Sequence, residues 1–159
     1  MTSLLVRRAL PEDLEQILKL QAQDTLHYFE EPSEVSANQR EAFDEIDADV
    51  NQDLLVGELD GQIVCTAQVT WMRMLSADGG LYCQVEAVRT DTAMRGRGIG
   101  ASLMTSIEGE ARKRGAARIQ LTSNSERTRA HAFYEQLGYV ASHVGMKKYL
   151  VGRGRRGDL

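Results

Sequence analysis

A segment rich in glycine and arginine, Arg95-Gly96-Arg97-Gly98-Ile99-Gly100, has the residue types and spacing that could hold a phosphate group. Glycine lets the backbone approach a ligand closely and turn several N–H groups toward it. A helix is expected to begin at the end of this segment, and its N-terminus adds about half a positive charge at the same place. Together with its two arginines, the segment predicts a cradle for a pyrophosphate group.

Two familiar phosphate-binding motifs do not fit this segment. A nucleoside triphosphatase loop needs Gly-Lys followed by Ser or Thr, whereas Ile99 and Gly100 follow Gly98 here. A dinucleotide-binding loop follows the first strand of its fold and has an acidic residue about 20 residues later. This loop lies late in the chain, and residues 115–121 contain no acidic side chain. Nucleoside triphosphate and NAD sites are therefore excluded.

Apolar periodicity and turn residues predict the elements that must position the loop. Strands are expected over residues 4–6, 54–56, 63–74, 81–88 and 117–122, with one or two more over 139–150; helices are expected from Pro11, after the capping box Ser36–Gln39, after the loop, and over 127–137. This order predicts an α/β (mixed α+β) domain with helices on both faces of one sheet. A helix joins strands 81–88 and 117–122, so these two should be parallel neighbours.

Length and composition place the chain among ordinary globular domains. It has 159 residues, of which 42% are apolar, which excludes disorder for most of its length. We expect one domain over residues 1–150 and a mobile Gly/Arg-rich tail over 151–159. No stretch approaches the ~18 apolar residues of a membrane span, and the N-terminal residues turn charged too early for a signal peptide. Cys65 and Cys83 are expected to be free thiols, which favours a cytoplasmic protein without membrane contact.

The net charge of −4 conceals a division of the chain. Residues 1–60 contain 15 acidic and 4 basic side chains, whereas residues 61–159 contain 8 acidic and 15 basic ones. The overall acidity argues against a nucleic-acid partner. The basic second part suits an anionic ligand and the acidic first part a cationic co-substrate, although solvated helix faces would give the same division.

Three segments of the chain match one family pattern together. The loop fits Arg95-x-x-Gly98-x-Gly100, the strand before it reads Gln84-Val85-Glu86-Ala87-Val88, and a later block reads Ala130-His131-Ala132-Phe133-Tyr134-x-x-Leu137-Gly138-Tyr139. Over about residues 4–150 the sequence resembles the GCN5-related N-acetyltransferases. The loop alone would be a weak signal, but the loop, the tyrosine block and the order of strands are specific together.

The resemblance implies a fold and a set of ligands. The fold would be a central, mixed and mostly antiparallel sheet with a splayed pair of parallel strands. The ligands would be acetyl-CoA and a primary amine of a small molecule, with no metal. The loop amides would hold the pyrophosphate, the pantetheine arm would pair with the central strand near Val88, and an N–H at a bulge would polarise the acetyl carbonyl. The cofactor contacts implied are Val88, Arg95, Gly96, Arg97, Gly98, Ile99, Gly100, Ala101, Asn124 and Arg127. Family members often have an asparagine at the position of Arg127, so either Arg127 reaches a phosphate or Asn124 takes the amide role.

Two side chains are candidates for proton transfer in the implied reaction. An alkyl amine arrives protonated, and Glu86 would accept that proton directly or through water. Strand alternation puts Glu86 on one face with Val88, and a carboxylate inside a central strand is costly unless it is used or paired; the alternative is a structural glutamate. Tyr134 would protonate the departing thiolate, and the alternative is a core tyrosine.

Other functions and partners stay open. A protein or peptide N-acetyltransferase and a catalytically silent acyl-CoA sensor are the alternatives to a small-molecule enzyme, and a homodimer is expected. Acceptor selection is expected in residues 21–36, 74–80 and 139–150. The first of these contains Tyr28, Glu30, Glu31 and Glu34, which could form an acidic mouth for a cationic amine. His131 is more simply a packed or solvated side chain than a base, and His27 and His143 lack metal-ligand spacing.

Overall fold

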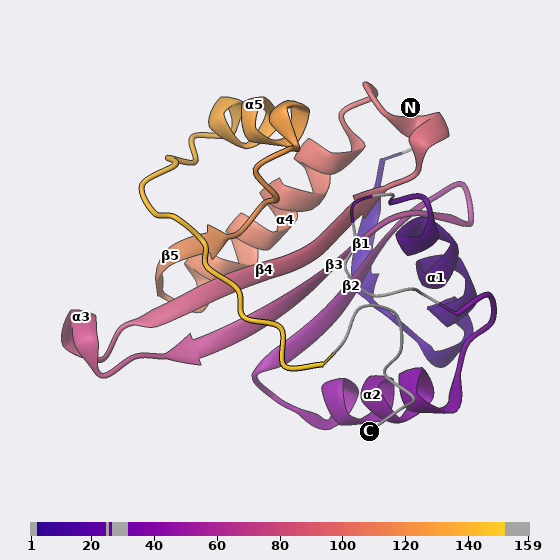
Figure 1. Ribbon diagram of the computed structural model, residues 1–159, viewed down its shortest axis with the longest axis horizontal. Helices are drawn as coiled ribbons and strands as arrows, with labels where there is room; N and C mark the ends of the chain where they lie inside the picture. The colour runs from indigo at the N-terminus through magenta and orange to yellow at the C-terminus, as the bar shows by residue number, and fades with distance from the viewer. Residues whose placement is uncertain (1–2, 25, 27–31, 152–159) are drawn as a thin grey trace. The chain divides into compact units, whose positions relative to one another are not determined.

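The computed structural model of the protein describes residues 3–24, 26 and 32–151 (Figure 1). The chain divides into two compact units. The first consists of residues 1–24 and 31–121, and the second of residues 25–30 and 122–159. Each unit is described by itself, beginning with the first.

A five-stranded sheet forms the centre of the first unit. Its strands are β1 (Leu5–Arg8), β2 (Gln52–Leu59), β3 (Gln62–Arg73), β4 (Leu81–Thr90) and β5 (Ala116–Leu121), in the spatial order β1-β2-β3-β4-β5. The first three neighbouring pairs are antiparallel and β4–β5 is parallel. The structure therefore confirms the mixed, mostly antiparallel sheet and the parallel pair on either side of the glycine loop.

Helices cover both faces of this sheet. The helical elements of the unit are η1 (Pro11–Asp13), α1 (Leu14–Ala22), α2 (Ala37–Ala48), α3 (Ser76–Gly79), η2 (Thr92–Met94) and α4 (Ile99–Lys113). Ile17 of α1 and Phe43 of α2 pack with Val56 of β2 in one buried cluster. Residues an odd number apart on a strand point to opposite faces, and Asp53 of β2 belongs to the other face, where Arg114 at the end of α4 lies over Trp71.

Local sequence signals account for where these helices begin. Pro11 stands at the first position of η1, where its missing N–H costs nothing. Ser36 and Gln39 form the predicted capping box of α2, because each side chain bonds the other residue's backbone N–H at 3.1 Å. In α4 the predicted apolar stripe of Ile99, Leu103 and Ile107 is buried.

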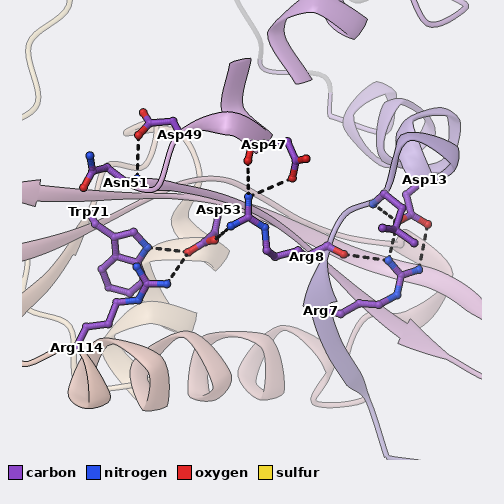
Figure 2. A network of polar contacts seen from close by, with 10 residues as sticks. Arg7, Arg8, Asp13, Asp47, Asp49, Asn51, Asp53, Trp71 and Arg114 are labelled. Carbon is purple, nitrogen blue, oxygen red and sulfur yellow. Dashed lines mark hydrogen bonds and ion pairs between the residues drawn. The ribbon is translucent and has the colours of Figure 1, made fainter. Parts of the chain in front are cut away.

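Polar side chains around Asp53 join several elements at the end of the sheet where β2 begins (Figure 2). We call this end the closed end of the sheet. Asp53 is buried and accepts hydrogen bonds from Arg8 Nη1 and from Trp71 Nε1, both at 2.7 Å. Arg114 Nη2 lies 3.4 Å from the same carboxylate, and its guanidinium lies 4.3 Å above the ring of Trp71. We call Arg8, Asp53, Trp71 and Arg114 the Asp53 cluster. It joins β1, β2, β3 and the end of α4, elements far apart in sequence.

At the other end of the sheet, β4 and β5 part. Their register runs from Leu81 opposite Ala116 to Val85 opposite Leu121, and β4 continues to Thr90 beyond it. The second half of β4 is thus paired with β3 alone among the described strands of this unit. β4 thus extends beyond its parallel neighbour, in agreement with the splayed pair that the family resemblance implies. Within this unit the edge of β4 that faces away from β3 has no partner strand from Glu86 onward, and we call it the open edge.

The second unit contains α5 (Thr128–Gln136) followed by an irregular segment. The strands expected over residues 139–150 are wrong, because no strand occurs among the described residues 122–151. Val140, Val144 and Met146 alternate as a strand face would, yet all three are exposed. A strand forms only where a neighbour pairs with its backbone, and alternation in sequence does not supply that neighbour.

Candidate active site

The open half of β4 contains a bulge. Gln68 of β3 lies opposite Glu86, and Thr66 lies opposite Arg89, so β4 advances three residues while β3 advances two. Ala87 and Val88 therefore share a place opposite Ala67, and Ala87 has the left-handed backbone conformation, with φ of 51°. Such a conformation is strained for a residue with a Cβ and clusters at functional sites.

Backbone groups just after the bulge point to the open edge. The Asp91 N–H donates to the Val64 carbonyl at 2.9 Å, and bonded pairs alternate along an antiparallel ladder. The Arg89 N–H therefore points to β3, and the Val88 carbonyl, on the opposite side of the same peptide unit, points away from it. An extended ligand lying along this edge would meet the Val88 carbonyl.

The bulge corrects two expectations about Glu86. The extra residue reverses the alternation, so Glu86 shares a face with Arg89, and Val88 lies on the opposite face. Glu86 is also the exposed residue of β4, so the cost of burying its carboxylate does not arise. The place of Glu86 at the beginning of the open edge, beside the bulge, is the observation that supports a role for it.

The glycine loop lies between η2 and the N-terminus of α4. Gly98 caps α4 with φ of 78°, and Gly96 also has a left-handed backbone with φ of 74°. A Cβ at either glycine would meet no atom within 4 Å, so the space in front of both is open. Glycine is needed here for its backbone angles, and the open space leaves room for a ligand.

The residues of the loop fit a pyrophosphate group. The first N–H groups of α4, at Ile99, Gly100 and Ala101, have no partner within the helix and carry the positive end of its dipole. Arg95 and Arg97 are exposed beside them, and Arg97 Nη1 contacts the Met94 sulfur at 3.1 Å. Open space, unsatisfied donors and two cations together suit a doubly charged anion.

Three other predicted residues lie in the second unit. The Asn124 side-chain oxygen accepts from the Glu126 N–H at 2.9 Å, and the Asn124 carbonyl accepts from the Arg127 N–H at 3.0 Å. The Asn124 carbonyl also meets His131 Nε2 at 2.9 Å, which agrees with a packed histidine. Asn124 therefore shapes the turn into α5, and Arg127 stands at the N-cap of that helix.

Tyr134 lies half-buried on α5 among aromatic rings. The rings of Phe133 and Tyr139 meet it edge-on, with centroids at 5.0 and 5.6 Å. These contacts orient the phenol and hold α5 to the segment that follows it. They are compatible both with a packing role and with a proton donor.

Cys65 and Cys83 are buried and unbridged, as the sequence predicts. Burial raises the pKa of both thiols to about 11, so neither is a thiolate at neutral pH. Among the described residues, no group of three or more His, Cys, Asp or Glu side chains could hold a metal ion. No helix in the described part of the chain is long and apolar enough to cross a membrane. His27, Tyr28, Glu30, Glu31 and the tail from residue 152 onward lie outside the described residues.

Sequence reasoning missed an ion pair, Asp24 with Arg89, beside the bulge. Arg89 follows the bulge, and its Nη2 lies 2.5 Å from the buried carboxylate of Asp24, just after α1. Its Nη1 donates to the Val88 carbonyl at 2.8 Å. The 65 positions between Asp24 and Arg89 leave no local signal for the pair.

The family model described as "Acetyltransferase (GNAT) family" matches residues 14–139 of the chain. The chain belongs to the GNAT acetyltransferase family. The matched range includes β4 with its bulge, the glycine loop, α4 and α5. Acetyltransferases of this family use acetyl-CoA, which contains a pyrophosphate group. This explains why a loop that suits pyrophosphate occurs next to an open strand edge.

Individual relatives agree with this membership. An aminoalkylphosphonate N-acetyltransferase of Salmonella typhimurium is 44% identical over 57 residues, a match that spans 36% of this chain and only 37% of that protein. A protein of Bacillus halodurans C-125, named as a transcriptional regulator, is 36% identical, with a TM-score of 0.87 over 93% of this chain and 100% of that one. A Trypanosoma brucei acetyltransferase, 24% identical, shares the fold with a TM-score of 0.77 over 93% of this chain and 100% of that one.

Proposed function

We propose that the protein is an acetyl-CoA-dependent N-acetyltransferase that acetylates a primary amine of a small molecule. The observation that carries the proposal is the bulge at Ala87 and Val88, which begins an open strand edge and is followed by the glycine loop of α4. Within the GNAT family this arrangement suits a long, thin donor with a pyrophosphate at one end and an acyl group at the other.

The glycine loop and strand β4 bind different parts of the donor. Gly96, Gly98 and the first N–H groups of α4 hold the pyrophosphate, with Arg95 and Arg97 as counter-charges. The pantetheine arm lies along the open edge of β4 and bonds the Val88 carbonyl. A main-chain N–H at the bulge polarises the acetyl carbonyl.

Bound acetyl-CoA supplies a thioester whose carbonyl carbon forms a bond to the amine nitrogen while its bond to sulfur breaks. Glu86 takes the proton that the amine must lose, directly or through one water molecule. Tyr134 gives a proton to the sulfur that leaves, and Asn124 or Arg127 assists the cofactor. The exposure of Glu86 supports its part, since an exposed carboxylate can pass its proton to solvent and begin again.

The acceptor is proposed as a small amine because the curated relative, the Salmonella enzyme, is named for one, an aminoalkylphosphonate. We further propose that the chain works as one domain over residues 1–150, in the cytoplasm, as a homodimer without nucleic acid. Size-exclusion chromatography with light scattering would contradict the dimer if the protein eluted as a monomer at micromolar concentration.

The proposed activity is tested by measuring free thiol released from acetyl-CoA with polyamines, aminoglycosides, amino acids, aminophosphonates and short peptides. We expect release with at least one small amine, and a kcat about 10–100-fold lower for Tyr134→Phe at unchanged affinity for CoA. Turnover on peptides alone would favour a protein acetyltransferase. CoA binding without turnover would favour a sensor, and absence of both would overturn the proposal.

A further inference from the structure

The end of α1 is attached to the chain between the bulge and the glycine loop at two points. The Asp24 carboxylate pairs with Arg89, and the Gln23 side-chain oxygen accepts from the Thr92 N–H at 2.9 Å. Gln23 and Asp24, just after α1, therefore contact two residues that lie three positions apart in the chain. These two residues belong to the segment that leads from the acyl end of the proposed donor site to its pyrophosphate end.

The bonding of Arg89 is specific to a guanidinium. One nitrogen pairs with Asp24 and another donates to the Val88 carbonyl, so a rigid planar group spans an ion pair and a peptide unit. The Asp24 side chain is 5% exposed and that of Arg89 24% exposed, so this pair is screened less by water than a surface pair. A carbonyl oxygen has two lone pairs, so the Val88 carbonyl that accepts from Arg89 can also accept from a ligand at the open edge.

We propose that the Asp24–Arg89 pair is a positioning element that sets the direction of the Val88 peptide group at the bulge. This inference rests on the proposed function, because it concerns the acyl end of the same site. Asp24 belongs to residues 21–36, in which acceptor selection is expected. Under the proposed function, the pair would join the segment expected to select the acceptor to the strand edge along which the donor lies.

A kinetic separation follows from this arrangement. The loop at residues 95–100 holds the pyrophosphate whether or not the Val88 peptide group is well directed. Loss of the pair should therefore reduce turnover far more than affinity for CoA, because small displacements of reacting atoms are costly in rate.

The test uses Asp24→Asn, Arg89→Gln and the double variant in the full chain. We expect each single variant to lower kcat about tenfold and to change the calorimetric Kd for CoA less than about threefold. The double variant should be no slower than the singles, because the two residues act as one unit, whereas independent roles would multiply to about a hundredfold. In each variant, the infrared carbonyl band of bound ¹³C-acetyl-CoA should shift from its position in the wild-type complex toward its frequency in water, because the misdirected bulge polarises the acetyl carbonyl less.

The matched control is Glu108→Gln with Arg112→Gln, an exposed ion pair of 2.6 Å on α4, for which no change is expected. Unchanged kcat in folded Asp24 and Arg89 variants would overturn the inference, and so would a parallel collapse of kcat, CoA affinity and Tm. If Arg89→Gln does not fold, Arg89→Lys keeps the charge without the planar bridge, and a wild-type kcat for it would equally overturn the inference. Failure of the wild-type protein to bind CoA or turn over would overturn the proposed function instead.

Discussion

The two ends of the sheet use charged residues in opposite ways. At the closed end, the Asp53 carboxylate contacts side chains from β1, from β3 and from the end of α4, so the cluster holds these elements together. At the open end, β4 loses β5 after Val85, takes a strained bulge and presents backbone groups to an edge. The ion pair at this end, Asp24 with Arg89, is partly buried, and we propose that it directs a backbone group instead of joining the strands of the sheet.

From this difference we infer that the closed end carries stability, and we propose that the open end carries the chemistry. A carboxylate with partners from several elements contributes to folding, because its loss removes an acceptor from each of them and leaves the Trp71 N–H without its hydrogen bond. An edge that keeps donors and acceptors available gives up that stabilisation and gains a place for a ligand. Substitutions at the closed end should change unfolding, and those at the open end should change binding and rate.

The largest effect is expected from Asp53→Ala at the closed end. It removes the buried carboxylate that Arg8, Trp71 and Arg114 share, and we expect it to lower the free energy of unfolding by about 3 kcal/mol. Denaturant unfolding measures this. Asp47→Ala is the matched control, since Asp47 bonds the same Arg8 but its side chain is 57% exposed, against 9% for Asp53. Equal losses for both would remove the distinction drawn for the closed end.

Next in size is Gly98→Asp in the glycine loop. Aspartate strains a backbone with φ of 78° and puts a negative charge where the pyrophosphate is proposed to lie. We expect the calorimetric Kd for acetyl-CoA to rise about 100-fold or more, roughly 2.7 kcal/mol. Gly98→Asn controls for shape and backbone without the charge, and should weaken binding much less. Equal effects of Asn and Asp would show that the charge plays no part.

A smaller and more specific effect is expected from Glu86→Gln. If Glu86 accepts the proton of the amine, kcat should fall about tenfold, and the fall in rate on the acidic side of the pH–rate profile should be lost. The measurement is kcat against pH for both proteins with the same amine. A retained acidic limb would mean that the amine loses its proton elsewhere, and the open end would then bind the donor without supplying the base.

Sequence reasoning succeeded where the signal is local. The place of the glycine loop before α4 follows from residue types at short spacing, as does the capping box of α2, and the apolar stripe on α4 follows from helical periodicity. It failed on the strands expected over 139–150, where alternation was present but the backbone found no partner strand among the described residues.

The bulge shows why the site was predicted only in part. Its existence was implied by family resemblance, but Ala87, an ordinary alanine, gives no local sign of a left-handed backbone. The extra residue then moved Val88 to the face opposite Glu86, contrary to simple alternation. The Asp24–Arg89 pair was missed because contacts between distant residues depend on the folded topology.

The left-handed backbone of Ala87 also bears on how this protein would respond to selection for heat resistance. An alanine in that conformation costs roughly 1–2 kcal/mol, which glycine would largely avoid. A screen for thermostable variants would therefore be expected to select Ala87→Gly. The same glycine would make the bulge more flexible, so the backbone would hold the geometry proposed for turnover less firmly. At this one residue, a gain in melting temperature and a loss of rate would have the same origin.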